Sequence, residues 1–249
     1  MIVIKGLNTD QSNSKKNNKD NNNVLDSNNH NHGGNMDTLD VVHYFSSSIY
    51  AIKKMEFLDQ IRDVSKKFIN KCKCGDNPMT VMTSDFSGDP DAKDFAQYVS
   101  QTAWNILQSQ GYNMEKSVTF FTEMWTQEHN YQSSMDSHMH GYGVQMSAFY
   151  FLDVPENSSV VIFHDPRPAK VIINLPELDD GKITTASNSI SFVPVEGTIM
   201  FVPPYVAHQF TRNLNTKKPM RFVHMNLGVA LAPEKSSIST VEKNNTEVI

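Results

Sequence analysis

Two stretches in the first half of the chain carry apolar residues at every third or fourth position. In residues 51–70 this stripe consists of Ile52, Met55, Leu58, Ile61, Val64 and Phe68. Residues 91–110 show the same period, with Asp89 and Pro90 before them and Gly111 after them. A period near 3.6 residues predicts an amphipathic helix, and the flanking residues are typical of helix ends. We therefore predict helices over 51–70 and 91–110.

The second half has a different pattern, with short runs of β-branched and aromatic residues between turn signals such as PENS, DPRP, DDGK and NTKKP. The runs are SVTFFTEMW, MSAFYFL, SVVIFH, KVIINL, SISFV, TIMFV, HQFTR and RFVHMNL. Many short strands without long helices between them indicate an all-β sandwich or barrel. The predicted fold class is α+β and mainly β, with the two helices supporting the β core.

The two ends of the chain are polar. Residues 8–35 consist mostly of Asn, Ser, Asp and Lys and include a second HxH pair, His30 and His32. Such a composition buries too little apolar surface to offset the entropy of ordering, so it predicts disorder. We divide the chain into a disordered tail (1–36), a folded domain (37–232) and a flexible C-terminal tail (233–249).

Composition and charge limit the possible partners and location. The chain has 249 residues, 39% of them apolar, a formal net charge of -5 and a pI near 6.0. These values, without a cluster of Lys and Arg, argue against a nucleic-acid partner. The apolar start is too short for a signal peptide and no segment is long enough to span a membrane, so we expect a cytoplasmic protein. Cys72 and Cys74 lack the second pair that a structural zinc site needs, and we expect reduced thiols.

Three histidines form the candidate chemistry. His138 and His140 are two residues apart, and on a strand they would project to the same face. On its own such a pair is more often structural, but His208 opens a later strand after GTIMFVPPYVA and supplies a third imidazole. Arg221 opens another apolar strand, where a guanidinium needs an anion. By strand parity Tyr150 would share the face of the histidine pair.

The order of these motifs resembles the Fe(II)- and 2-oxoglutarate-dependent oxygenases, whose core is a double-stranded β-helix, or jelly roll. More narrowly, it resembles an HxH-type branch found in marine bacteria and phages. The resemblance rests on HMHGYGVQMSAFYFL from His138, the FHDPR turn, the GTIMFVPPYVAH block and RFVHMNL, and it covers about residues 37–229. It implies a dioxygenase of the hydroxylase type that acts on a small molecule or a side chain.

The resemblance also implies roles for individual residues. His138, His140 and His208 would bind Fe(II), and Arg221 would pair with the far carboxylate of 2-oxoglutarate, to which Tyr150 could also donate a hydrogen bond. The chain departs from the family at His140, where most relatives carry Asp or Glu. Asp136, two residues before His138, is therefore an alternative third ligand.

Other interpretations stay open at this point. Three histidines also suit an iron dioxygenase that uses no 2-oxo acid, or a non-catalytic jelly-roll module that holds a metal or another ligand. Arg167 in the HDPRP turn either recognises an acidic group of the substrate or pairs with Asp165.

Overall fold

The structure is a computed structural model that describes residues 3–6, 38–41, 45–72 and 79–233. The chain divides into two compact units, Met1–Ser46 and Ser47–Ile249. In the first unit, β1 (Val3–Gly6) pairs in parallel with β2 (Thr38–Val41). The stretch predicted to be disordered, with His30 and His32, lies outside the described residues, as do Cys74 and all but the first residue of the predicted C-terminal tail.

The second unit contains two helices, three short 3-10 helices and ten strands among its described residues. In chain order these are β3 (Tyr50–Lys53), η1 (Met55–Phe57), α1 (Leu58–Cys72), β4 (Thr80–Met82), η2 (Pro90–Ala92), α2 (Lys93–Ser109), β5 (Ser117–His129), β6 (Met135–His138), β7 (Met146–Asp153), β8 (Val161–His164), η3 (Pro168–Ile172), β9 (Ser189–Phe192), β10 (Thr198–Val202), β11 (His208–Phe210) and β12 (Met220–Leu231). Neither described helix is long and apolar enough to cross a membrane.

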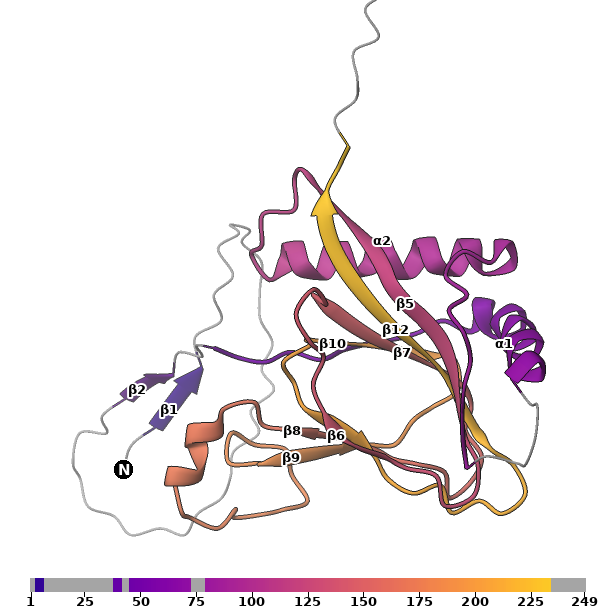
Figure 1. Cartoon of the computed structure of the whole chain (residues 1–249). Coiled ribbons are helices and arrows are strands. Elements are labelled where there is room, and N and C mark those ends of the chain that lie inside the picture. The colour runs from indigo at the N-terminus through magenta and orange to yellow at the C-terminus, as the bar shows by residue number, and fades with distance from the viewer. Residues whose placement is uncertain (1–2, 7–37, 42–44, 73–78, 234–249) are drawn as a thin grey trace, which may run out of the picture. The chain divides into compact units, whose positions relative to one another are not determined.

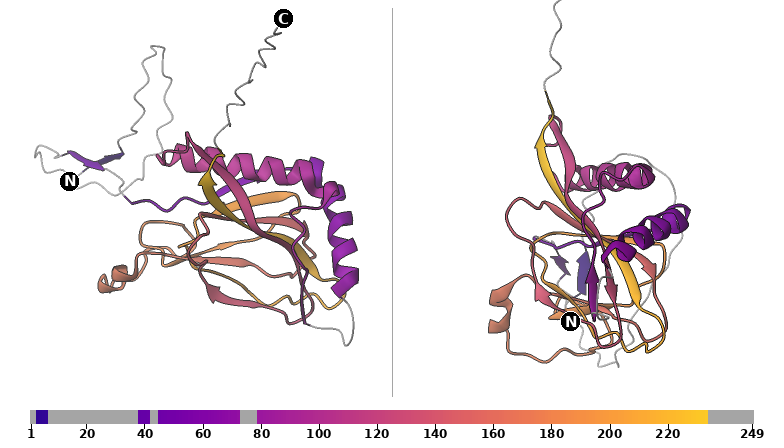
Figure 2. Two further views of the ribbon diagram at one scale, coloured as in Figure 1. Left: turned by 45° about the horizontal axis from the view of Figure 1, so that its top comes forward. Right: turned by 45° about the vertical axis from the view of Figure 1, so that its right-hand side comes forward.

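These strands form two sheets. The larger has the order β3-β10-β7-β12-β5-β4, and the smaller has the order β6-β11-β8-β9. Both helices pack on one face of the larger sheet, and the smaller sheet lies across from its other face (Figure 1; Figure 2). All strand pairs of this unit are antiparallel. The predicted mainly β fold with a jelly-roll core and supporting helices is confirmed.

The larger sheet buries both of its faces. Along β7, Tyr150 and Leu152 pack in the cluster beneath the helices, whereas Phe149 and Phe151 pack in the cluster between the two sheets. Successive side chains of a strand point to opposite faces, which explains this division. The space between the sheets is where the candidate site lies.

Helix α2 agrees with its prediction. The Asp89 carboxylate accepts a hydrogen bond from the Asp91 backbone N–H at 3.0 Å at the start of the preceding 3-10 turn. Gly111 ends the helix with φ of +97°, a conformation that costs glycine little. The apolar stripe of this helix is buried and consists of Phe95, Val99, Ala103, Ile106 and Leu107.

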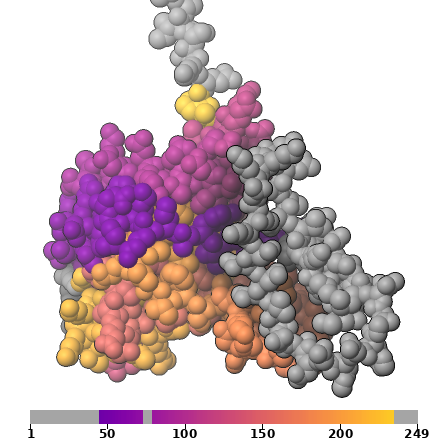
Figure 3. Space-filling view, turned by 180° about the vertical axis from the view of Figure 1, so that it is seen from behind, coloured from indigo at the N-terminus to yellow at the C-terminus, as the bar shows by residue number. Residues whose placement is uncertain are grey.

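The first helix begins later than its pattern predicts. The prediction of helix from residue 51 is wrong, because Tyr50–Lys53 forms an antiparallel edge strand with Ile52 opposite Ile199. The Lys54 N–H then donates to the Gly197 carbonyl at 2.6 Å. The purple segment around α1 lies above the orange segment around residue 200 in Figure 3. Residues 51–53 have a helical apolar period, but their hydrogen bonding to the edge of β10 makes them a strand.

The predicted strand KVIINL is also wrong. Residues 170–175 lie partly in η3, and their apolar side chains are exposed. Asp165 accepts hydrogen bonds from Arg167 and forms an ion pair with Lys170 at 3.0 Å. This pairing turns the chain directly after β8, so the run cannot extend along the sheet.

Candidate metal centre

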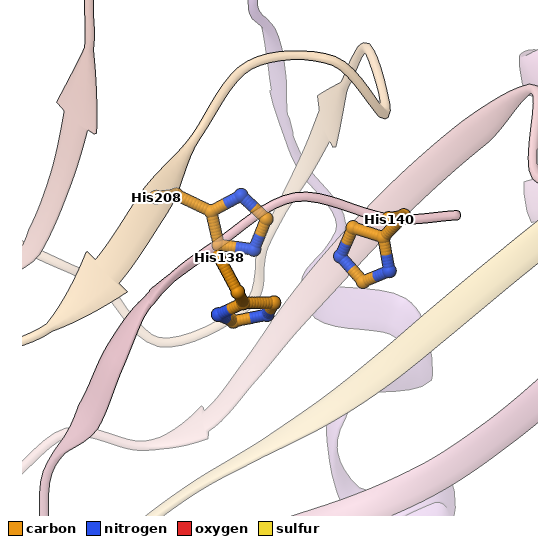
Figure 4. Close-up of side chains that lie close together, drawn as sticks. All are labelled: His138, His140 and His208. Atoms are coloured by element: carbon orange, nitrogen blue, oxygen red, sulfur yellow. The ribbon is translucent and has the colours of Figure 1, made fainter.

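His138, His140 and His208 lie together between the two sheets (Figure 4). One potential ligand nitrogen of each lies within 4.8 Å of those of the other two. His138 ends β6 and His208 opens β11, where the two residues are paired across the strands. His140 follows β6, and its backbone N–H donates to the Pro204 carbonyl at 3.0 Å. The loop before His208 thus holds His140 in place, which strand parity alone would not have done.

Hydrogen bonds fix the orientation of two of the rings. Nδ1 of His138 lies 2.8 Å from the Asp136 carbonyl oxygen, and Nδ1 of His208 lies 3.0 Å from the Val206 carbonyl oxygen. A carbonyl accepts only, so each Nδ1 carries the proton and each Nε2 has a free lone pair. The Nε2 atoms of His140 and His208 are buried without a hydrogen-bond partner. Buried nitrogens in this state are suited to bind a metal ion.

The environment keeps two of these imidazoles neutral. Burial first, and then the neighbouring His208 and His138, lower the pKa of His140 to about 4. Burial also lowers the pKa of His208 to about 4. Phe149 and Phe163 flank the His208 ring at centroid distances of 5.2 and 6.2 Å. Since a metal binds the neutral form of imidazole, both residues are ready to bind at neutral pH.

A fourth histidine, which the sequence analysis did not assign to the site, lies beside the cluster. The His224 ring centroid is 5.0 Å from that of His140 and 4.2 Å from that of Trp125. Both ring nitrogens of His224, Nε1 of Trp125 and Oε1 of Gln127 are buried without a partner. Burial lowers the pKa of His224 well below its ordinary value. His224 and Arg221 are three residues apart on the same strand, so their side chains point to opposite faces. Only one of the two can therefore face the histidines.

Arg221 lies on the opposite face of β12. Its Nε donates to Oε2 of Glu128 at 2.7 Å, and its Nη1 donates to Oδ2 of Asp153 at 3.1 Å. Val223, two residues further, packs in the cluster beneath the helices, whereas His224 contacts His140. The expectation that Arg221 faces the histidine cluster is therefore corrected: its guanidinium is bound by two carboxylates on the helix side of the sheet.

Tyr150 also belongs to the helix side, which corrects its expected position. Its hydroxyl donates to the Lys54 carbonyl at 2.6 Å, and its ring packs against Phe95 at 4.9 Å. Asp136, the alternative ligand, is exposed, and the group of potential ligands that lie close together contains three histidines without it.

Arg167, a candidate for substrate binding, makes a bidentate ion pair instead. Its Nε and Nη2 donate to the two carboxylate oxygens of Asp165 at 2.9 and 2.7 Å. Hydrogen bonding from Arg167 and Lys170 holds the pKa of Asp165 well below its usual range. Of the two interpretations of Arg167, the structure shows the pairing within the turn.

Comparison with known proteins gives a family match for part of the chain and several solved structures of similar fold. Residues 123–222 match the family described as "Putative 2OG-Fe(II) oxygenase". Similar solved structures include AviO1 from Streptomyces viridochromogenes Tue57, 9% identical over 75% of this chain and 92% of that chain, with a TM-score of 0.55. Another is a Pseudomonas putida prolyl-4-hydroxylase, 8% identical over 74% of this chain and 93% of that chain, with a TM-score of 0.50. A search of curated proteins found no match.

At these identities the likeness to solved structures establishes the shared jelly-roll fold. The family match covers residues 123–222, less than half of the chain, and supports an oxidoreductase with Fe(II) and 2-oxoglutarate as cofactors. The residues present fit this metal, because imidazole is a suitable ligand for iron and two of the three Nε2 atoms have no other partner.

Proposed function

We propose that His138, His140 and His208 bind Fe(II) and that the protein is a 2-oxoglutarate-dependent dioxygenase that hydroxylates its substrate. The observation that carries this proposal is the convergence of the three imidazoles inside the family-matched segment. The bound iron would supply the activation of dioxygen. Hydroxylation is the reaction of one protein of similar fold, the prolyl-4-hydroxylase.

The surrounding residues prepare the centre for this chemistry. The carbonyls of Asp136 and Val206 hold two rings with Nε2 free, and the phenyl rings of Phe149 and Phe163 limit the access of water to His208. Three neutral imidazoles leave Fe(II) with both of its positive charges. The two negative charges of 2-oxoglutarate would neutralise them, whereas a site with one carboxylate ligand would be left with an excess negative charge.

A titration tests the proposal. Addition of 2-oxoglutarate to the Fe(II)-loaded protein without oxygen should give a visible charge-transfer absorption band, and oxygen should then be consumed with release of succinate. His208→Ala should abolish both. His164→Ala is the matched control, because Nε2 of His164 lies 3.4 Å from Oε1 of Gln209 and His164 is not one of the three clustered histidines.

Two other outcomes would contradict the proposal in different ways. Oxygen consumption that needs iron but not 2-oxoglutarate would favour a three-histidine dioxygenase, which the position of Arg221 also permits. Metal binding without any oxygen consumption, across a panel of small molecules and peptides, would favour a non-catalytic module.

A further inference from the structure

Two aromatic side chains beside the histidine cluster carry buried N–H donors without an acceptor. Trp125 on β5 is paired with His224 on β12, which is paired with Phe149 on β7. The His224 ring lies 4.2 Å from Trp125, 4.9 Å from Phe149 and 5.0 Å from His140, measured between ring centroids. Trp125 and His224 therefore form the wall of the site next to one of the proposed ligands.

No described protein group accepts a hydrogen bond from these donors. Nε1 of Trp125 and both ring nitrogens of His224 are buried without a hydrogen-bond partner, and the whole His224 side chain is 2% exposed. Buried polar groups in folded proteins nearly always have partners, so such atoms point to a bound group. Indole Nε1 is a donor only, and a neutral imidazole has one donor nitrogen. The two side chains together offer two donors to an acceptor.

The charges of the site favour a carboxylate as this acceptor. Arg221 is occupied by Glu128 and Asp153 on the other face of β12, so it does not supply a cation here. Fe(II) bound by three neutral imidazoles would keep both of its positive charges and would take over that role. Neutral N–H donors then suffice to orient the far end of a dianion, because its charge is already balanced.

We propose that the N–H groups of Trp125 and His224 bind the far carboxylate of 2-oxoglutarate, in the place that the sequence assigned to Arg221. This inference rests on the proposed function, since it requires 2-oxoglutarate at the iron. It makes His224 a binding residue for the cosubstrate rather than a fourth metal ligand.

Two substitutions remove the donors and keep an aromatic side chain at each position. Trp125→Phe and His224→Phe should each weaken the binding of 2-oxoglutarate to the Fe(II)-loaded protein by about 10- to 100-fold, the usual effect of losing a hydrogen bond to a charged group. Calorimetry without oxygen measures this affinity. Binding of 2-oxopentanoate, which carries a methyl group where 2-oxoglutarate has its far carboxylate, should not change. Fe(II) affinity should also stay at the wild-type value.

Trp104→Phe is the matched control, because Nε1 of Trp104 donates to the Ser117 carbonyl at 2.9 Å and does not face the site. Wild-type affinity for 2-oxoglutarate in both site variants, or an equal loss for both 2-oxo acids, would overturn the assignment. Loss of Fe(II) by His224→Phe would instead make His224 a ligand. If the wild-type protein binds iron but no 2-oxoglutarate, the proposed function itself fails. Trp125→Phe removes atoms and does not overpack the site, so it answers the question if the His224 variant does not fold.

Discussion

His140 is the proposed ligand whose chemistry would set the charge of the iron centre. It is held by the Pro204 carbonyl and lies within the three-histidine group. His140→Asp would give two histidines and one carboxylate and lower the net charge of the iron site from two to one. We expect Fe(II) still to bind but the affinity for 2-oxoglutarate to fall by about 1–3 kcal/mol, or roughly 5- to 150-fold.

Calorimetry on the Fe(II)-loaded variant measures this change. Leu178→Asp introduces the same negative charge at an exposed position outside the group and should leave the affinity nearly unchanged. Equal or tighter binding of 2-oxoglutarate by His140→Asp would show that the charge of the ligand set does not govern cosubstrate binding.

Arg221 should matter for stability rather than for cosubstrate binding. Its guanidinium compensates Glu128, whose side chain is 0% exposed, and Asp153. Arg221→Leu removes a cation from a buried carboxylate, and breaking such a pair costs about 3 kcal/mol. Urea unfolding should show this loss, while the affinity for 2-oxoglutarate stays within a factor of about two. A sharp loss of that affinity in a folded Arg221→Leu protein would restore the role that the sequence suggested.

The sequence predicted the histidine cluster but not the rest of the site, and the reason lies in burial. Nearly every residue of β7 and most of β12 are buried on both faces. Their sequences therefore lack the alternation of polar and apolar residues that tells one face from the other. Arg221 and His224 point to opposite faces of β12, but nothing in the sequence indicated which of them faces the histidines. Tyr150 was misplaced for the same reason.

At the scale of elements, the local sequence pattern predicted the buried helix α2 correctly. It did not predict segments whose conformation depends on the edge of a sheet. Helix α2 follows the 3-10 turn that Asp89 caps, ends before Gly111 and packs along its apolar stripe. In contrast, the start of the predicted first helix became β3 because β10 offered an unpaired edge. The KVIINL run was predicted to be a strand but does not join the sheet, because the ion pairs of Asp165 turn the chain away from it. Both errors come from tertiary partners that local patterns do not contain.

Gly197 fixes the junction between β3 and β10. Its φ of +75° disfavours other residues, and a Cβ at this position would clash with Sδ of Met55. Gly197→Ala should therefore destabilise the protein by about 1–3 kcal/mol in urea unfolding. Gly88→Ala is the control, because a Cβ there meets no atom within 4 Å and its φ is not positive. Equal stability of the two variants would show that this junction tolerates a side chain.

At the scale of the whole molecule, buried histidines should make stability depend on pH. Burial lowers the pKa of His129 to about 4, between the rings of Phe210 and Phe222. In the unfolded chain this pKa is near 6.5, so between pH 6.5 and 4 the unfolded chain binds a proton that the folded chain does not. Stability is therefore full above pH 6.5 and falls as the pH drops toward 4, by about 3 kcal/mol for this residue.

Urea unfolding of the metal-free protein at pH 7, 6 and 5 measures this slope. His140 and His208, whose pKa values also lie at about 4, should add to it. His129→Gln should lower the number of protons taken up on unfolding by about one, which reduces the slope of stability with pH. The variant should still fold, because Gln127 and Ser159 can hydrogen-bond to an amide. An unchanged slope in this variant would mean that His129 is charged in the folded protein.

Metal binding should stabilise the second unit, because the three histidines come together only when β6 is paired with β11 and the loop before β11 holds His140. Fe(II) at 100 times its dissociation constant should add about 2.7 kcal/mol, which raises the Tm by roughly 5–11 °C for a domain of this size. A thermal melt without oxygen, with and without Fe(II), measures the shift. His208→Ala should abolish it, whereas His164→Ala should keep it. The chain carries a second HxH pair, His30 and His32, so the double variant His30→Ala, His32→Ala is a further control and should show the full wild-type shift. A shift that survives in His208→Ala and disappears in that double variant would place the metal on the N-terminal pair and remove the basis of the proposed centre.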